Sequence, residues 1–288
     1  MPLIENFLSD LKLQADRDLK GAELVLMHEG PIELVGWLCE QSFEKTVKYV
    51  YAYYKLRIQN NPLDSVYEKL KEKSHLGAYE LIINMMREIF RDFWDNFWQS
   101  FLTRDVFPEH LKNAMIDNLK KSKISIMAQM EKIIDDGATT IGALTQNIEK
   151  YDVWLKQSPA EWMQEYMGQF DYANTVATMT NPIIVDMKKA AGPDFSKIVS
   201  STFSPQFLQS FFAFAIRSMA LAVRVLPYFE TSRYPAKDFN YSNLRLFREY
   251  ESELRPYFAY LVQELRNFNV AADNFIKDFF SILKTDQK

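Results

Sequence analysis

The sequence has little glycine and a single cysteine. Its 288 residues include 8 Gly and 11 Pro. So few glycines argue against a fold made of many tight β-turns, and the recurring Leu, Met, Glu and Lys residues favour long helices. The one cysteine, Cys39, excludes an internal disulfide. Its place in an apolar stretch predicts a small core residue rather than a nucleophile.

The sequence also lacks an excess of positive charge. Its formal net charge is −4, which argues against bulk DNA binding and requires a local basic patch for any contact with nucleic acid. Two lysine clusters are candidates for such a patch: Lys69, Lys71 and Lys73, and Lys120, Lys121 and Lys123. Both alternate with acidic or apolar residues in the manner of solvated helix faces.

No long uninterrupted hydrophobic run is present. The most apolar stretch, 207–226, contains Arg217 and Arg224, whereas a membrane span needs about 20 predominantly apolar residues. The first residues also lack the basic-then-apolar pattern of a signal peptide. We therefore expect 207–226 to be a buried helix and the protein to be soluble and cytoplasmic, without membrane contact.

Motifs that bind cofactors or metals are missing as well. The sequence contains no glycine-rich phosphate loop, no nucleophile elbow and no paired-carboxylate motif. Its three histidines do not stand at ligand spacing from another histidine or a carboxylate. We therefore expect neither a metal site nor a cofactor.

Helical periodicity is what the sequence does contain. We predict helices over 5–27 and 32–59, separated by His28-Glu29-Gly30-Pro31, where a left-handed cap at glycine and then proline end the first helix. The helix over 32–59 has an apolar stripe made of Val35, Cys39, Phe43, Val47, Val50 and Tyr54. A short helix capped by Ser65 and Glu68 follows. Longer helices are expected over 76–102, 109–135, 207–226 and 241–268. The predicted fold is all-α, an up-and-down antiparallel helical bundle with a phenylalanine-rich core.

One face of the helix over 32–59 changes from apolar to polar along its length. It begins with Leu34 and Trp37 and continues with Gln41, Glu44 and Lys48. Glu44 and Lys48 form either an ordinary exposed pair one helical turn apart or part of a polar cluster inside the bundle. The second interpretation predicts that this face meets Asp18 and Arg233.

Three segments resemble the HEPN family (higher eukaryotes and prokaryotes nucleotide-binding). The first two, Ala15-x-x-Asp18-Leu19-x-x-Ala22 and Gln41-x-x-Glu44-Lys45-x-x-Lys48, are similar to the first two helices of that domain. The third, Ser232-Arg233-Tyr234-Pro235, resembles the family's Thr-Arg-Tyr-Pro-Asp segment, with Ala236 in place of its aspartate. The resemblance covers about 8–90 and 205–268. It implies a HEPN-like bundle made of 1–95 and 205–288, with 96–204 as an additional helical insertion.

The resemblance also implies a homodimer that binds a nucleotide or RNA. Some members are ribonucleases that use an Arg and a His four to six residues apart, but no histidine follows Arg233 at that spacing. We therefore predict a non-catalytic module. Its ligand-binding or buried polar cluster would consist of Asp18, Gln41, Glu44, Lys45, Lys48, Arg233 and Tyr234.

Two alternatives remain open at this point. Arg104 and His110 have a spacing that suits a metal-independent ribonuclease, in which the histidine exchanges protons with the RNA and the arginine stabilises phosphate charge. The other alternative is a structural adaptor whose aromatic helix around Trp94 and Trp98 docks a partner, such as a nucleotidyltransferase of the kind that HEPN domains accompany.

Overall fold

The computed structural model describes residues 2–72, 75–92, 185, 206–225 and 251–285. Within these ranges the chain forms helices joined by short loops and contains no strand, which confirms the all-α class. The elements are α1 (Pro2–Met27), α2 (Ile32–Tyr53), the π-helical turn η1 (Tyr54–Ile58), α3 (Leu63–Glu72), α4 (His75–Asp92), α10 (Gln206–Val225) and α13 (Glu251–Thr285).

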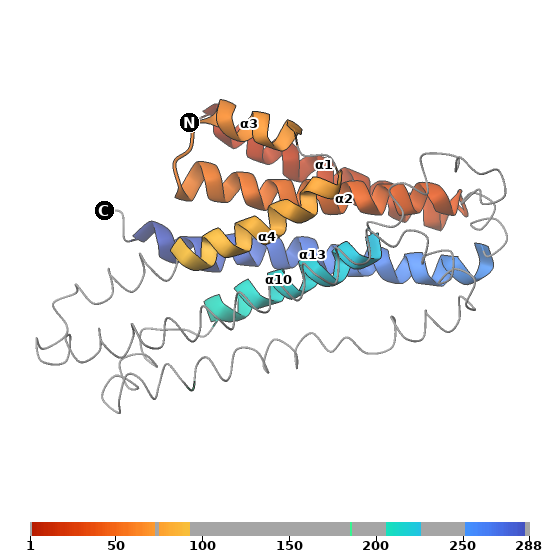
Figure 1. Cartoon of the computed structure of the whole chain (residues 1–288). Coiled ribbons are helices and arrows are strands. Elements are labelled where there is room, and N and C mark those ends of the chain that lie inside the picture. Colours follow the sequence, from red (N-terminus) through yellow and green to blue (C-terminus); the bar gives the residue numbers. More distant parts are fainter. Residues whose placement is uncertain (1, 73–74, 93–184, 186–205, 226–250, 286–288) are drawn as a thin grey trace, which may run out of the picture.

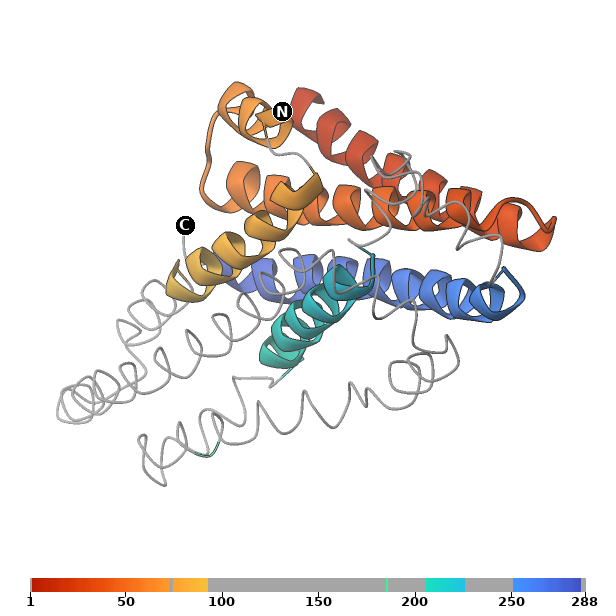
Figure 2. The same ribbon diagram turned by 45° about the vertical axis from the view of Figure 1, so that its right-hand side comes forward.

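The longer helices lie side by side, but they do not all alternate in direction (Figures 1 and 2). α1 and α2 form an antiparallel hairpin, and α13 lies along both of them. α13 runs antiparallel to α1 and to α10 but parallel to α2, and α4 crosses α2 obliquely. The arrangement within the described residues is therefore a bundle with one parallel pair at its centre, rather than a strictly up-and-down one.

α2 is the central helix and contacts α1, α4, α10 and α13. Its predicted apolar stripe is buried over its whole length: Val35, Cys39, Phe43, Val47, Val50 and Tyr54. Burial raises the pKa of the Cys39 thiol well above its ordinary value, so the thiolate is not formed at neutral pH. The prediction that Cys39 is a small core residue is confirmed.

Phenylalanine rings fill the space between α2, α10 and α13. The ring of Phe214 on α10 stacks on Phe275 and Phe268 of α13, with centroids 4.9 Å and 5.4 Å apart. Phe43 of α2 lies 5.4 Å from the other side of Phe268. Aromatic pairs at such distances gain stability beyond the burial of their area. The predicted phenylalanine-rich core is confirmed here.

The α1–α2 loop ends α1 in a way that differs from the prediction. The left-handed residue is Glu29, with φ 52°, rather than Gly30. The amide N–H groups of Glu29 and Gly30 donate to the carbonyls of Leu26 and Val25, the pattern of a Schellman cap. A Cβ on Gly30 would lie 2.8 Å from Cγ1 of Val25. Glycine is therefore required for close packing here, not for a positive φ.

Other helix ends also differ from the predictions. α2 finishes in the π-helical turn η1. α3 begins at Leu63, so Ser65 lies inside the helix and does not cap it. α13 continues well past Phe268, because Ala272 and Phe275 extend its buried stripe. None of the described helices is both long enough and apolar enough to cross a membrane.

Candidate functional site

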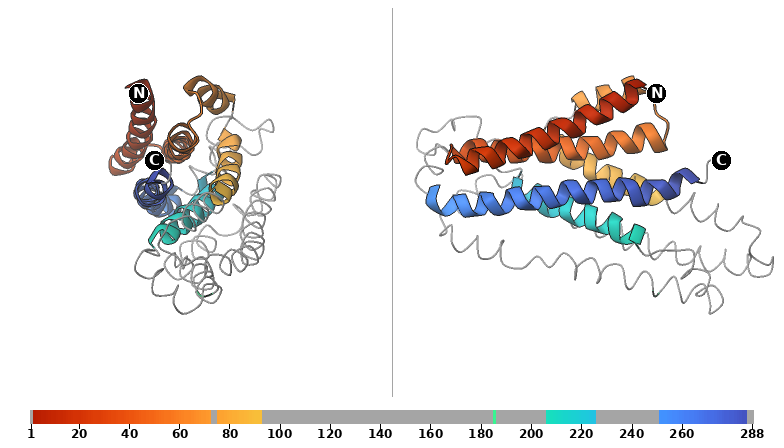
Figure 3. Two further views of the ribbon diagram at one scale, coloured as in Figure 1. Left: turned by 90° about the vertical axis from the view of Figure 1, so that its left-hand side faces the viewer. Right: turned by 180° about the vertical axis from the view of Figure 1, so that it is seen from behind.

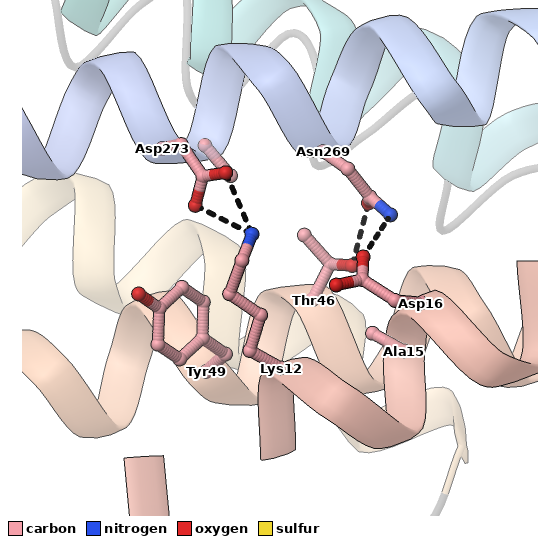
Figure 4. A pocket seen from close by; sticks show the side chains of 8 residues that line it. Lys12, Ala15, Asp16, Thr46, Tyr49, Asn269 and Asp273 are labelled. Atoms are coloured by element: carbon pink, nitrogen blue, oxygen red, sulfur yellow. Dashed lines mark hydrogen bonds and ion pairs between the residues drawn. The ribbon is translucent and has the colours of Figure 1, made fainter. Parts of the chain in front are cut away.

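A small polar hollow lies where α1, α2 and α13 meet (Figure 4). We call it the three-helix seam. Two alanines, Ala15 and Ala272, bring the helices close together and line it along with six polar side chains. These six side chains are Lys12 and Asp16 from α1, Thr46 and Tyr49 from α2, and Asn269 and Asp273 from α13.

Asn269 connects the three helices at one end of the seam. The hydroxyl of Thr46 lies 2.7 Å from Oδ1 of Asn269 and 2.9 Å from the carbonyl oxygen of Ser42. Nδ2 of Asn269 is 3.5 Å from Oδ1 of Asp16. Because Asn269 is buried, loss of Thr46 would leave Oδ1 of Asn269 without its partner and without water to replace it, whereas Thr46 would keep the Ser42 carbonyl if Asn269 were lost.

Lys12 occupies the other end of the seam. Its ammonium donates to both carboxylate oxygens of Asp273, at 2.7 Å and 2.6 Å, and lies 5.7 Å from the centre of the Tyr49 ring. Partial burial, followed by the nearby charges of Asp273 and Asp16 and by Tyr53, raises the pKa of Tyr49 to about 12. The phenol therefore stays protonated at neutral pH and is not a general base.

The seam is too small to enclose a nucleotide. The space between its side chains, including the part that opens to solvent, is about 180 Å³. Pockets for small-molecule ligands usually measure about 300–1,000 Å³. The ammonium of Lys12 already pairs with Asp273, and the buried amide of Asn269 already bonds with Thr46. The geometry is that of an interhelical polar joint.

Asp18 and Lys45, two residues of the predicted cluster, form an ion pair between α1 and α2. Both side chains are largely buried, with relative exposures of 20% and 23%. The pair connects the two segments on which the HEPN resemblance rests, and it lies beside the close approach of α1 to α2 at Gly21 and Leu38.

Gln41, Glu44 and Lys48 lie on a different face of α2. Lys48 Nζ is 2.5 Å from Glu44 Oε1, and Gln41 Nε2 donates to Glu40 at 2.7 Å. Glu44 is only 7% exposed, so the interpretation of an ordinary exposed pair is wrong. Successive helix residues are rotated by about 100°, and this rotation separates Glu44 from Lys45. Arg233 and Tyr234 lie outside the described residues, as do Arg104 and His110.

A second polar cluster, which the sequence reasoning missed, surrounds η1. We call it the π-turn network. Oη of Tyr54 donates to Oδ2 of Asp92 at 2.5 Å, and Nε2 of Gln59 lies 3.0 Å from the same oxygen. Lys55 donates to Gln59 at 2.8 Å and forms an ion pair with Glu88 of α4. The network fastens the end of α2 to the end of α4.

Lys55, the lysine of this network, is charged but lies in the interior of the bundle. Lys55 is buried, and its Nζ lies 5.6 Å and 5.5 Å from the ring centres of Tyr51 and Tyr54. The two aromatic faces and the carboxylate of Glu88 are therefore the groups that surround its charge. Burial, and next the hydrogen bond to Asp92, raise the pKa of Tyr54. π-Turns are frequent at functional sites, but this one is filled by its own side chains.

Comparisons with protein-family models, curated proteins and solved structures find no match to this chain. The HEPN resemblance therefore depends on the quoted residues alone. Among the described residues, no three His, Cys, Asp or Glu side chains converge in a way that would hold a metal ion.

Proposed function

We propose that this chain is a non-catalytic helical module of the HEPN type, which binds a nucleotide or RNA as a homodimer. The observation that carries the proposal is the ion pair of Asp18 with Lys45. These residues come from the two segments that resemble the first two HEPN helices, and the ion pair joins those two helices. The all-α fold is compatible with the same family.

The way in which the charged side chains pair with one another supports binding rather than catalysis. Asp18 is paired with Lys45, and Glu44 with Lys48. A general acid or base needs access to its substrate, whereas these side chains are mostly buried and held by each other. The seam is too small for a nucleotide. A phosphate would therefore be bound on an open surface, for which Arg233 is the candidate cation.

The test is binding of a fluorescently labelled RNA and of labelled ATP, measured by anisotropy without added metal. We expect wild-type protein to bind one of them and Arg233→Ala to bind it at least tenfold more weakly, since about 1.4 kcal/mol corresponds to tenfold. Lys237→Ala, which removes a positive charge four residues away, is the matched control. Equal binding by wild type and Arg233→Ala would contradict the role given to Arg233.

Thermal unfolding of the same variants separates a ligand contact from a structural one. If Arg233 also pairs with Glu44 or Asp18, Arg233→Ala should lower stability, but by less than the about 3–5 kcal/mol of an unpaired buried carboxylate, because Lys48 or Lys45 still pairs with it. If it contacts the ligand, the unfolding temperature should stay near that of wild type while affinity falls.

The ribonuclease alternative makes a different prediction. Cleavage of a structured RNA without metal, abolished in His110→Ala, would make the chain an enzyme that uses Arg104 and His110. The adaptor alternative predicts no binding of either RNA or ATP. Co-purification of a nucleotidyltransferase that is lost on replacement of Trp94 and Trp98 would support it.

A further inference from the structure

α1 lies at the outer edge of the described bundle (Figure 3). Its inner side contacts α2 and α13 and buries Leu8, Ala15, Leu19 and Ala22. The opposite side carries large apolar side chains that no described residue covers. Leu3 and Met27 are 73% and 72% exposed, and Leu13 and Leu24 are 44% and 45% exposed.

These four residues belong to one stripe along the whole helix. Steps of three and four residues keep positions on one face of a helix, and the same spacing lets two helices pack along their length. We call the set the outer stripe: Leu3, Asn6, Asp10, Leu13, Arg17, Lys20, Leu24 and Met27. All eight are exposed. At 1.5 Å per residue, α1 presents this stripe over roughly 39 Å.

The outer stripe is complementary to itself when a second copy runs in the opposite direction. A two-fold axis between Leu13 and Arg17 places Leu3 opposite Met27 of the second copy. The same axis places Asp10 opposite Lys20, and Leu13 opposite the aliphatic stem of Arg17. Each contact occurs twice, as in any isologous interface.

The parallel arrangement is unfavourable by the same reasoning. It would set Asp10 against Asp10, Arg17 against Arg17 and Lys20 against Lys20, and like charges placed together are costly. Within the described part of the chain, no hydrogen bond or ion pair involves Asp10, Arg17 or Lys20. Their charges are therefore available to a second molecule.

We propose that two copies of this chain associate through the outer stripe of α1, with the two helices antiparallel about a two-fold axis. Leu3, Leu13 and Met27 supply the apolar contact, Leu24 faces Asn6 of the second copy, and two Asp10–Lys20 pairs set direction and register. The inference builds on the homodimer of the proposed function by naming its surface. It is tested by association state alone, so its failure is distinguishable from a failure of RNA binding.

The experiment is sedimentation velocity of the full chain over a wide concentration range. We expect wild type to dimerise. Asp10→Lys and Lys20→Asp each place two like-charged pairs in the interface and should each weaken dimerisation at least tenfold. Asp64→Lys, the same charge change at an exposed position on α3, should dimerise like wild type.

Two further samples make the test specific for the antiparallel register. An equimolar mixture of Asp10→Lys and Lys20→Asp restores both charge pairs, so it should form a heterodimer although neither variant dimerises alone. The double variant D10K/K20D should dimerise by itself. Circular dichroism confirms that each variant is folded.

Three results would overturn the inference. The first is a wild-type protein that stays monomeric at high concentration. The second is a dimer that neither charge reversal weakens, which would locate the interface on another surface. The third is a mixture of the two reversal variants that remains monomeric, which would exclude the antiparallel register.

Discussion

α13 contacts α10 through phenylalanine rings and contacts α1 through polar side chains. On the α10 side, Phe268 and Phe275 stack on Phe214. On the α1 side, Asp273 pairs with Lys12, and Arg266 with Glu23 at 2.5 Å. An ion pair of Arg217 with Glu264 at 3.2 Å and a hydrogen bond from Ser210 to Asp278 also join α10 to α13. What distinguishes the α10 side is therefore its stacked rings, not an absence of polar contacts.

The difference indicates a division of roles between the two sides. Burial of apolar area contributes most of the free energy of folding but has little directional preference. Partly exposed ion pairs contribute little free energy, but their geometry selects one alignment of the helices. We infer that the aromatic side stabilises the bundle, and that the three-helix seam sets the position of α1 and hence of its outer stripe.

The largest expected effect is on the aromatic side. Phe268 is fully buried between Phe43 and Phe214. Phe268→Ala would leave a cavity there and should lower the free energy of unfolding by about 3–5 kcal/mol. Urea unfolding measures it. A loss below about 1 kcal/mol would show that the aromatic side is not the main source of stability.

The next effect concerns the buried amide of the seam. Asn269→Leu removes one of the two acceptors near the Thr46 hydroxyl, which keeps the Ser42 carbonyl, so we expect a loss of about 1–1.5 kcal/mol in urea unfolding. Asn84→Leu, the same substitution at an exposed position of α4, is the matched control and should change stability little. Equal effects at both positions would contradict the role of Asn269 as an interhelical joint.

The third effect is a dependence on pH. The pKa of Tyr49 is about 12 in the folded chain, against 10.0 for its ordinary value. The stability that this difference represents is fully present below pH 10 and is lost as pH rises toward 12. Tyr49 is only partly buried, so the loss should be only about 1 kcal/mol after solvent screening.

Urea unfolding at neutral pH and at about pH 11 tests this prediction, with the pH chosen between the two pKa values. Tyr49→Phe should lose less stability on going to alkaline pH than wild type does. Tyr67→Phe, which changes an exposed tyrosine of α3, should behave like wild type. An identical alkaline loss in wild type and Tyr49→Phe would remove Tyr49 as its source.

The smallest effect is at the ion pair of the seam. Lys12→Met keeps the aliphatic stem but removes the charge opposite Asp273, and we expect a cost of about 0.5 kcal/mol that disappears in high salt. A salt-independent loss of more than about 2 kcal/mol would mean that the pair contributes as a buried one. The contrast with Phe268 would then be much weaker.

Regular periodicity explains which parts of this fold are predictable from sequence. The stripe from Val35 to Tyr54 follows the helical repeat without interruption, and burial over its whole length confirms the prediction. In such stretches one local rule, the spacing of apolar residues, decides the outcome. Asp18 was predicted to meet the face of Gln41, Glu44 and Lys48, but it pairs with Lys45 on another face of α2.

The two polar clusters depend on information that is not local. The predicted end of the last helix at Phe268 excludes Asn269, Ala272 and Asp273, so three of the eight residues that line the three-helix seam fall beyond it. The π-turn network requires the extra residue of η1, and its partners Glu88 and Asp92 are more than thirty positions away from Lys55 and Tyr54. No repeat in the sequence specifies either contact.

The central claim is that this chain binds RNA or a nucleotide without cutting RNA. Its most direct test measures binding and cleavage on the same samples. Labelled structured RNA and labelled ATP are titrated with wild-type protein in the presence of a chelator, and the RNA samples are then run on a denaturing gel. The account predicts that anisotropy rises for one of the probes while the RNA stays intact. Shortened RNA, or no rise in anisotropy with either probe, would contradict it.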